Sequence, residues 1–305
     1  MKLQRLIIAV SCIIAAILPH ASAFETPGHK LVAAIAYDHL TPAAKQKIDA
    51  IIAADPRGRT FIEAARWPDQ IKHRKGLPNQ KNIDATTGAP KNPDWHFVDL
   101  PYDSPGSAAF KNVLANGGKS PVWTDDHSAN VVTGIVFLSR ELRNPGKAPQ
   151  DAAALKQWNA VQADKLSFLI HLVGDAHQPL HCEDRNDIGG NQYTIDYPAI
   201  TYQNLHGLWD EAPVIGAQDL SASKLATYAA QLQANNRPAN ANKLATVLDP
   251  RKWAQESYDL RIQAYGTPKD AKPKQTYIDA TVSTARERVV LGGLRLANLL
   301  NKIYR

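Results

Sequence analysis

A stretch of eleven residues near the middle of the chain, with the sequence HLVGDAHQPLH, concentrates three histidines and a carboxylate among apolar neighbours. In a helix, residues four apart project from one face, so His171 and Asp175 are placed to hold one ion between them. Pro179 ends that helix and lets His181 approach from another backbone direction, which fits a second, neighbouring metal better than the same one. A core helix gains nothing from three imidazoles that titrate at about pH 6.5, so the segment predicts a metalloenzyme. His177 fits the ordinary role of a hydrogen-bonded core histidine, one that does not bind the metal itself but orients a residue that does.

The first 23 residues have the pattern of a secretory signal peptide. Two basic residues, Lys2 and Arg5, precede an apolar run over 6–18, and the small residues Ala-Ser-Ala follow it. The apolar run is too short to span a bilayer permanently. We therefore expect cleavage before Phe24, an exported protein that is periplasmic or secreted and has no membrane anchor, and a single domain over 24–305.

Cysteine usage and charge narrow the class of protein further. Of the two cysteines, Cys12 would leave with the signal peptide, so the mature chain keeps only Cys182 and has no internal disulfide. An exported protein of this size without disulfides must be held together by its core and by metals. The signal peptide also carries two basic residues and no acidic ones, so the formal charge falls from +6 to +4. That mild excess is compatible with a polyanionic substrate, and no basic run is long enough to indicate a nucleic-acid tail.

Most of the chain has the periodicity of helices. The one convincing strand signal is the alternation of Tyr and Ile over 193–197, which predicts a small hairpin with Thr201-Tyr202. We therefore expect an all-α, mainly helical domain with long functional loops and at most a small β-hairpin. Helices are expected over 28–40, 42–54, 126–143, 151–178, 221–235, 250–264 and 276–302, with loops over 74–94, 100–121 and 183–204.

Other ligand-type residues fall in short motifs elsewhere in the chain. Asp69 stands in WPD, and His96 and Asp99 stand in WHFVD, in or beside loops. His206 and Asp210, in the motif NLHGLWD, repeat the four-residue spacing on a second short helix. Each of these motifs alone is weak evidence for a metal site, because a lone histidine is more often a core residue and a lone aspartate is more often a helix cap. Together they supply the nitrogen and oxygen ligands that zinc favours.

The expected N-terminus of the mature chain adds a further pair of ligands. Cleavage before Phe24 would release an α-amine with a pKa of about 8, which a metal readily deprotonates. His29 follows five residues later, close enough for both groups to chelate one ion. The alternative is that His29 simply begins a helix.

In order and spacing, these motifs resemble those of the zinc-dependent, single-strand-specific nucleases and 3′-nucleotidases, the S1/P1 nuclease family. The agreement runs from residue 24 to 210, and the segments WAQES at 253–257 and LRLA at 294–297 also resemble the family's closing helices. The resemblance implies the α-helical fold that these nucleases share with zinc-dependent phospholipase C, and three zinc ions per chain. It further implies hydrolysis of single-stranded DNA and RNA to 5′-phosphate products, together with 3′-nucleotidase activity. The implied partners are single-stranded nucleic acid and 3′-nucleotides, with no stable protein partner.

The resemblance also assigns roles to the ligand-type residues. Only a two-oxygen side chain such as Asp175 can bridge a close pair of ions, and a water or hydroxide between the two would attack the phosphorus. One zinc would be held by residues that resemble the family's ligands at Asp69, His96, His171 and Asp175. Its close neighbour would be held by the amine and carbonyl of Phe24, by His29 and by the other oxygen of Asp175. The third would be held by His181, His206 and Asp210.

The substrate-contacting residues follow from the same resemblance. Lys72 stands where the family typically has a phosphate-contacting arginine, and with Asp175 it completes the expected catalytic side chains. Phe97 resembles the residue that stacks on the nucleobase, and Asp99 the one that accepts hydrogen bonds from its edge. The alternative for Phe97 is ordinary core packing. The opposite wall of the base site is expected to come from Ile188, Gly190 and Asn191.

Three departures from the family pattern bear on function. Phe24 replaces the usual N-terminal tryptophan, which leaves amine and carbonyl ligation intact but changes the packing around that ion. Lys72 acts as a point charge and lacks the bidentate geometry of arginine. The absence of disulfides and of any Asn-x-Ser/Thr sequon indicates a bacterial exported type.

Two other functions stay open at this point. A zinc-dependent phospholipase C shares the fold and metal arrangement, but that group typically closes its ligand set with His-x-x-x-Glu and has a longer interval before the first histidine. Asp210 and the five-residue interval to His29 favour the nuclease. A non-catalytic zinc-binding protein would explain the ligands but gives no reason for Phe97, Asp99 or the Gly-Gly-Asn loop at 189–191.

Overall fold

The structure, a computed structural model, describes residues 25–123, 129–217 and 220–305, so the expected signal peptide and Phe24 lie outside the described residues. Within these ranges helices dominate and one two-stranded hairpin is the only sheet, which confirms the expected mainly helical fold. None of the described helices is long and apolar enough to cross a membrane. The elements are α1 (Glu25–Asp38), α2 (Pro42–Ala53), α3 (Phe61–Ala64), α4 (Trp67–Lys72), β1 (Gly76–Leu77), β2 (Gln80–Asp84), α5 (Ala108–Leu114), α6 (Val131–Arg143), α7 (Ala152–Asp175), α8 (Leu205–Glu211), α9 (Ala222–Asn235), α10 (Ala241–Ala245), α11 (Pro250–Asp259), α12 (Arg261–Ala264) and α13 (Gln275–Ile303), with 3-10 turns η1 (Pro93–His96), η2 (Asn116–Gly118), η3 (Pro179–His181) and η4 (Ala212–Val214).

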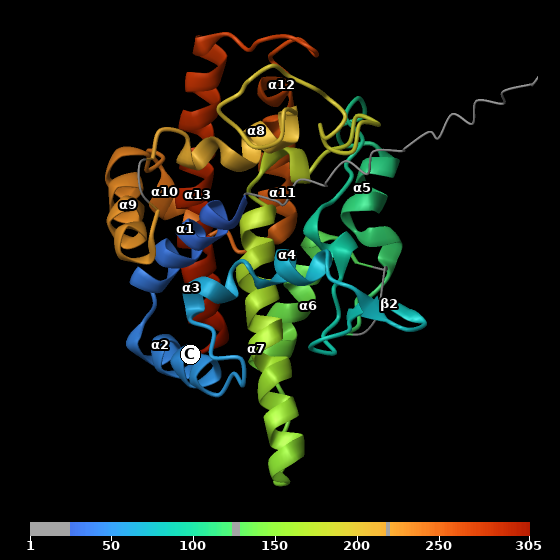
Figure 1. The fold of residues 1–305 in the computed structure, drawn as a ribbon, viewed down its shortest axis with the longest axis vertical. Coiled ribbons are helices and arrows are strands. Elements are labelled where there is room, and N and C mark those ends of the chain that lie inside the picture. Colours follow the sequence, from blue (N-terminus) through green and yellow to red (C-terminus); the bar gives the residue numbers. More distant parts are fainter. Residues whose placement is uncertain (1–24, 124–128, 218–219) are drawn as a thin grey trace, which may run out of the picture.

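Two long helices, α7 and α13, run along the long axis of the molecule, and α1 packs against both (Figure 1). The close packing of α1 on α13 depends on Gly293, because a Cβ there would lie 2.5 Å from Cγ2 of Ile35. On the other side of α7, helix α6 packs along its length. The segment 162–175 of α7 is buried throughout, so the last turns of this helix lie at the centre of the fold. The side chains that carry the candidate metal chemistry stand on these turns.

Side-chain caps fix where the helices begin. Helix α6 begins at Val131, because Asn130 and Thr133 form a reciprocal capping box. The start expected at residue 126 lies outside the described residues. Helix α7 begins after Asp151, whose carboxylate accepts the backbone N–H of Ala154. It ends at Asp175, three residues before the expected boundary, since the chain turns and Pro179 starts η3. The helix expected over 250–264 is divided at position 260 into α11 and α12.

The hairpin lies at a different place from the one expected. Strands β1 and β2 pair antiparallel around a tight turn at Asn79, which has φ of 65°, a conformation that asparagine tolerates well. The hairpin expected over 193–202 is wrong: that segment forms only the isolated bridge between Thr194 and Asn204. Its apolar side chains, Ile195 among them, pack into a small cluster instead of pairing into strands.

The segment expected as a loop over 100–121 contains helix α5. Ser107 accepts the backbone N–H of Phe110 and so caps its first turn. The ring of Phe110 packs edge-on against Tyr258 of α11, with ring centroids 4.9 Å apart. This tertiary contact stabilises a seven-residue helix that is too short to form by itself.

Candidate metal centre

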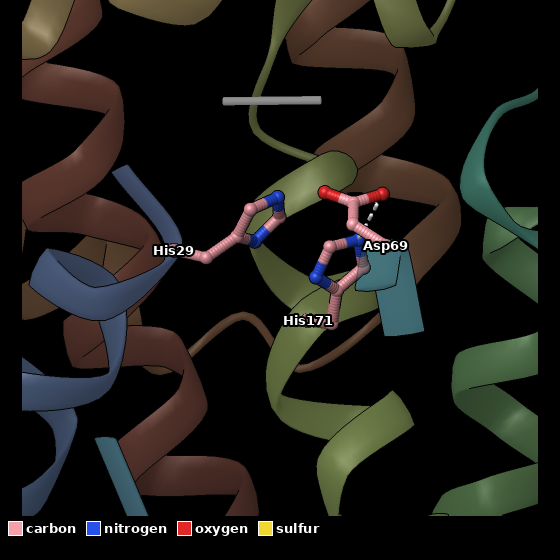
Figure 2. Close-up of side chains that lie close together, drawn as sticks. All are labelled: His29, Asp69 and His171. Atoms are coloured by element: carbon pink, nitrogen blue, oxygen red, sulfur yellow. Dashed lines mark ion pairs between the residues drawn. The ribbon is translucent and has the colours of Figure 1, made fainter. Parts of the chain in front are cut away.

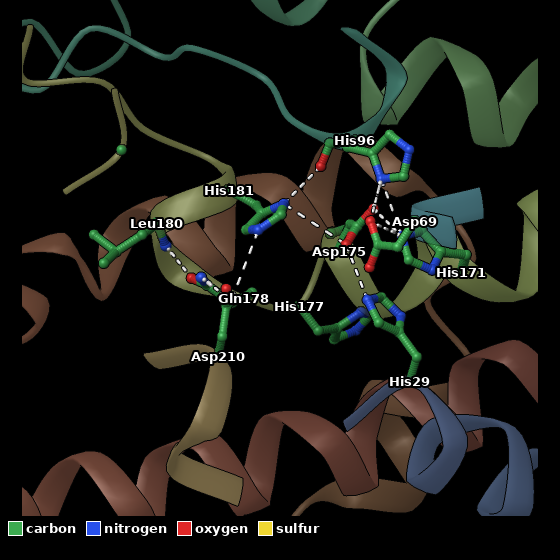
Figure 3. Close-up of polar contacts among 12 residues, drawn as sticks. His29, Asp69, His96, His171, Asp175, His177, Gln178, Leu180, His181 and Asp210 are labelled. Carbon is green, nitrogen blue, oxygen red and sulfur yellow. Dashed lines mark hydrogen bonds and ion pairs between the residues drawn. The ribbon is translucent and has the colours of Figure 1, made fainter. Parts of the chain in front are cut away.

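Five buried side chains from four segments of the chain meet at the carboxyl end of α7 (Figure 3). His29 comes from α1, Asp69 from α4, His96 from the end of η1, and His171 and Asp175 from the last two turns of α7. The most exposed of the five, Asp69, is only 7% exposed. Figure 2 shows His29 and Asp69 on two sides of His171, with the Asp69 carboxylate paired to the imidazole. The structure thus brings together all the described residues that the sequence assigned to the paired ions.

The spacing of the ligand atoms fits a metal better than a hydrogen-bond network. Ligands at about 2.0–2.1 Å from a tetrahedral zinc stand roughly 3.3 Å from one another. Oδ2 of Asp175 lies 3.1 Å from Nδ1 of His96 and 3.3 Å from Nε2 of His171, and Oδ1 lies 3.4 Å from Nε2 of His29. Oδ1 of Asp69 lies 3.5 Å from Nε2 of His171 and 3.6 Å from Nδ1 of His96. Among the described residues, neither oxygen of Asp175 accepts a hydrogen bond, although both are fully buried.

The two oxygens of Asp175 face different histidines. Oδ2 is turned toward His96 and His171, whereas Oδ1 is turned toward His29. One carboxylate therefore stands between two sets of nitrogen atoms. This is the arrangement that a bridging ligand between two close ions requires.

Gly174 makes room for His29. A Cβ at position 174 would lie 2.7 Å from Nδ1 of His29, closer than any real contact, so only glycine allows this ring to lie against α7. The ring stacks on His171 with centroids 3.6 Å apart and planes 15° apart. The glycine in HLVGD thus fixes the position of a candidate ligand from another helix.

Backbone carbonyls orient three of the imidazoles. Nδ1 of His171 donates to the carbonyl of Ala65, Nδ1 of His181 to that of His96, and Nδ1 of His206 to that of Gly189, each at 2.7 Å. In a neutral imidazole this leaves the Nε2 lone pair free to bind a cation. Hydrogen bonds of this kind are usual behind metal-binding histidines.

A second buried group lies beside the first. His181, on η3, and His206 and Asp210, on α8, offer ligand atoms that all lie within 4.8 Å of one another. Nε2 of His206 is 3.5 Å from Oδ2 of Asp210, and Nε2 of His181 is 3.9 Å from Oδ1. Gln178 donates from Nε2 to Oδ1 of Asp210 at 2.8 Å and fixes the carboxylate. These three residues are the ones that the sequence assigned to a third ion.

The buried carboxylates of the centre favour the binding of a cation. Burial alone would lower the pKa of His171, but Asp175 and Asp69 outweigh it and raise that pKa to about 10. Burial lowers the pKa of His96, with a contribution from nearby Lys72, and that of His206, with one from His181, in each case to about 3. Two imidazoles are therefore held neutral between carboxylates that stay ionised. Buried carboxylates need positive charge close by, and a divalent ion meets that need.

A cleft of about 500 Å³ opens over both groups. His96, His181 and His206 stand at its floor, and Lys72 reaches it with Nζ 3.3 Å from Oδ1 of Asp69. A volume of this size accepts a ligand as large as a nucleotide. Of the residues expected to contact substrate, Lys72, Phe97, Asp99, Ile188 and Asn191 line the cleft.

Phe97 and Ile188 have surroundings that suit ligand contact. Phe97 is half-buried at the cleft and is not part of the hydrophobic core, against the alternative of ordinary core packing. Ile188 is 55% exposed and has φ of 59°, a backbone conformation that β-branched residues rarely adopt. Gly190 does not line the cleft: it is buried, its N–H donates to Asp187, and Gly189 lines the cleft in its place.

Some cleft residues were not found from the sequence. Asp94 and Asp184 stand near Asp99. Asp99 is exposed at the cleft, where partial desolvation and the repulsion of the two neighbouring carboxylates together raise its pKa to about 6. The run of polar residues over 183–187, directly after Cys182, is the one sequence signal that would have pointed to Asp184. His177 lies outside both ligand groups, as its expected role requires.

Comparison with known proteins agrees with this geometry. The sequence profile of the S1/P1 nuclease family matches residues 24–305. The chain is 29% identical to nuclease P1 of Penicillium citrinum over 295 residues, covering 91% of this chain and 96% of that protein. It is 24% identical to endonuclease 1 of Arabidopsis thaliana over 98% of this chain and 93% of that protein, and 26% identical to nuclease S1 of Aspergillus oryzae over 66% of this chain and 58% of that protein. No comparable match points to a phospholipase or to a non-catalytic zinc-binding protein among these relatives. A match over nearly the whole chain establishes that this protein belongs to the S1/P1 nuclease family.

Proposed function

We propose that this chain is an exported zinc nuclease that cleaves single-stranded DNA and RNA to 5′-phosphate products and removes the phosphate of 3′-nucleotides. The observation that carries the proposal is the position of Asp175, whose two oxygens face different histidines beneath a nucleotide-sized cleft. The second buried group, at Asp210, lies under the same cleft. Family membership supports hydrolysis of phosphodiester bonds.

Three zinc ions fit the residues present. Imidazole nitrogen and carboxylate oxygen at tetrahedral spacing are the donors that zinc prefers. We assign Asp69, His96, His171 and Asp175 to one ion, His29 and Asp175 with the amine and carbonyl of Phe24 to its neighbour, and His181, His206 and Asp210 to the third. When bound, zinc supplies an acidified water and neutralises charge on phosphate oxygens.

The side chains of the cleft position the substrate. Lys72 places its ammonium group beside Asp69, where it would contact a phosphate oxygen as a point charge. Phe97 would stack on the nucleobase, while Asp99 would accept hydrogen bonds from the base edge. A base stacks on Phe97 only when it is unpaired, so this contact accounts for a single-strand preference. Ile188 and Asn191 would close the site from the opposite side.

The proposal includes export of the chain and removal of its signal peptide. Helix α1 begins at Glu25, directly after the residue that cleavage would leave as the N-terminus, and His29 lies within its second turn. Cleavage before Phe24 would therefore deliver an α-amine near a ligand that already faces Asp175. A chain that keeps its signal peptide has an amide nitrogen there, which binds a metal only after losing a proton at high cost.

One assay of the purified mature chain tests the function. We expect turnover of single-stranded DNA, of RNA and of a 3′-nucleotide, little turnover of duplex DNA, and none of phosphatidylcholine. Incubation with a strong chelator should abolish all of it, and added zinc should restore it, with close to three ions per chain by elemental analysis. Hydrolysis of phosphatidylcholine, or full activity with one ion or none, would overturn the proposal.

A further inference from the structure

A second, smaller hollow lies next to the nucleotide cleft. Its volume is about 240 Å³, and it shares two wall residues, Asp99 and Asp184, with the cleft. Tyr102, Asp103 and Arg185 form much of the rest of its lining. The two hollows therefore lie on opposite sides of one pair of carboxylates. A ligand that extends beyond the cleft in this direction enters the second hollow.

The walls of the second hollow are fixed to the metal centre. Segments 97–102 and 181–185 run side by side: Val98 donates its N–H to the carbonyl of His181 at 2.8 Å, and Asp184 donates to Leu100 at 3.0 Å. Pro101 and Asp184 form a parallel bridge. A backbone shift at one end of this ladder of hydrogen bonds would displace the residues at the other end. The hollow therefore keeps a constant position relative to Phe97 and His181.

Arg185 provides an exposed flat cation at this hollow. Its guanidinium lies over the rings of Tyr102 and Tyr265, at 5.1 and 5.0 Å from their centroids. The two rings meet edge to face at 5.4 Å, and the Tyr102 carbonyl accepts hydrogen bonds from Tyr258 and Arg261. Within the described part of the chain Arg185 forms no ion pair, although Asp184 and Asp187 are close in sequence. The two tyrosine rings thus hold the guanidinium in place, and its N–H groups can still donate to a ligand.

The chemistry of the hollow selects one kind of occupant. A planar guanidinium stacks on nucleobases, as in many complexes with single strands. Asp99, Asp103 and Asp184 would repel a bare phosphate but accept hydrogen bonds from amino groups on a base edge. Cytosine, adenine and guanine carry such amino groups, whereas thymine and uracil present carbonyl oxygens on either side of a single N–H. The fixed cation of Arg185 disfavours a metal ion among these carboxylates.

We propose that this hollow binds the base of the nucleotide adjoining the one held at Phe97, and that it prefers cytosine, adenine and guanine to thymine and uracil. Arg185 stacks on that base, and Asp103 at the exposed rim accepts from its amino group. The inference rests on the proposed nuclease function and adds a subsite to it. It makes the enzyme sensitive to the length of its substrate, because a mononucleotide fills only the cleft.

The test compares substrates of different length. Arg185→Ala is assayed on 3′-AMP and on two dinucleotides that extend it. In ApC, cytidine follows the scissile phosphate; in CpAp, cytidine precedes adenosine, and the 3′-phosphate of adenosine is the group released. The KM for at least one dinucleotide should rise by about fivefold or more, the effect expected for one stacked base, with 3′-AMP hydrolysis unchanged. The dinucleotide that responds gives the direction of the strand across the two hollows. Unchanged 3′-AMP hydrolysis also shows that the variant is folded.

Two further variants sharpen the result. Arg140→Ala is the matched control, since Arg140 is an exposed arginine over an aromatic ring, Phe137, far in sequence from this site. Its hydrolysis of all three substrates should be unchanged. Asp103→Asn should reduce the preference for cytidine over uridine in the responsive dinucleotide. An equal change on 3′-AMP and dinucleotides in Arg185→Ala, or no change on either, would overturn the subsite while the unsubstituted enzyme still cleaves both. Failure of the unsubstituted enzyme on all three substrates would overturn the proposed function and the subsite together.

Discussion

Arg295, fully buried on α13, donates from Nη1 to Nε2 of His177 at 3.0 Å. His177 in turn donates from Nδ1 to the carbonyl of Val173 at 2.7 Å. Burial, together with the positive charges of Arg288 and Arg295, keeps its pKa well below the usual value. The imidazole is therefore neutral, with one tautomer selected. Through this contact the C-terminal helix determines how the end of α7, two residues beyond Asp175, is oriented.

Replacing Arg295 by leucine should cost the fold about 2–3 kcal/mol. The arginine also donates to both oxygens of Glu256, at 2.6 and 2.8 Å, and its loss would leave that carboxylate with fewer partners. Partial exposure of Glu256 keeps the loss below that of a fully buried pair. Urea denaturation measures the change. The control is Arg251→Leu, which removes an exposed ion pair with Asp249 and should cost less than about 1 kcal/mol; equal losses in the two variants would show that the buried network has no special role.

Gly174→Ala should weaken metal binding without unfolding the chain. The added methyl group would displace the ring of His29, because its Cβ would stand 2.7 Å from Nδ1. We expect a loss of bound zinc by elemental analysis and a smaller rise of Tm on adding zinc. Gly292→Ala is the comparison, since its Cβ would meet His177 at 3.3 Å, which a slight shift relieves. Full zinc content in Gly174→Ala would contradict the placement of His29 as a ligand.

Stability and activity should both fall as the pH is lowered. In the folded chain the pKa values of His96 and His206 lie at about 3, whereas in the unfolded chain they lie at about 6.5. Between these values the unfolded state binds protons that the folded state does not, so the free energy of unfolding rises with pH through this window and falls on acidification. Each group contributes up to about 1.4 kcal/mol per pH unit. His171, whose pKa is raised, is protonated in both states well below pH 6.5 and adds no slope there. Asp99, Asp164 and Glu183, whose pKa values are raised to about 6, 6 and 8, bind protons in the folded chain over this window and offset part of the trend.

Urea denaturation at intervals between pH 7 and pH 4, with chelator present, measures this slope. With zinc present, protons compete with the metal for the same imidazoles, so turnover should decline below about pH 5. The variant His206→Gln removes one of the two groups and should flatten the pH dependence of stability. An equal slope in His206→Gln and in the unsubstituted chain would refute the assignment of His206 as a buried, neutral imidazole.

The residues of the centre could be predicted because their spacing is local. His171 with Asp175, and His206 with Asp210, are four apart on helices, and helical geometry alone places each pair on one face. The proximity of His29 to Asp175 and of Asp69 to His171 arises only when α1 and α4 pack on α7. The family resemblance supplied that information, which no local pattern contains.

Other parts depended on contacts that the sequence does not display. The alternation over 193–197 predicted a strand, but its side chains pack in a small cluster and pairing is limited to one bridge. Helix α5 was missed because seven residues have little helical signal, and its stability comes from Phe110 packing on Tyr258. Nothing in the amphipathic pattern of α13 indicated that Arg288 and Arg295 would be buried; both are held by Glu256 of α11.

The roles of Asp175 and Phe97 can be separated by their effects on different substrates. Asp175→Asn keeps the size of the side chain but replaces one oxygen and removes the charge. Because each oxygen faces a different set of histidines, we expect this change to abolish turnover on every substrate and to lower the zinc content.

Phe97→Ala should leave the zinc content unchanged, because Phe97 lines the cleft and is not part of either ligand group. Nucleotide binding should weaken by roughly 1–3 kcal/mol, the usual contribution of one base stacked on an aromatic ring. A phosphodiester that has no nucleobase should be hydrolysed nearly as well as by the unsubstituted enzyme, since the ring contacts the base and not the reacting phosphate. Comparing kcat/KM for a dinucleotide and for the same dinucleotide with an abasic sugar in place of its 5′ nucleoside measures the difference. Equal losses on the two substrates would mean that Phe97 acts through packing, and the single-strand preference would then need another physical origin.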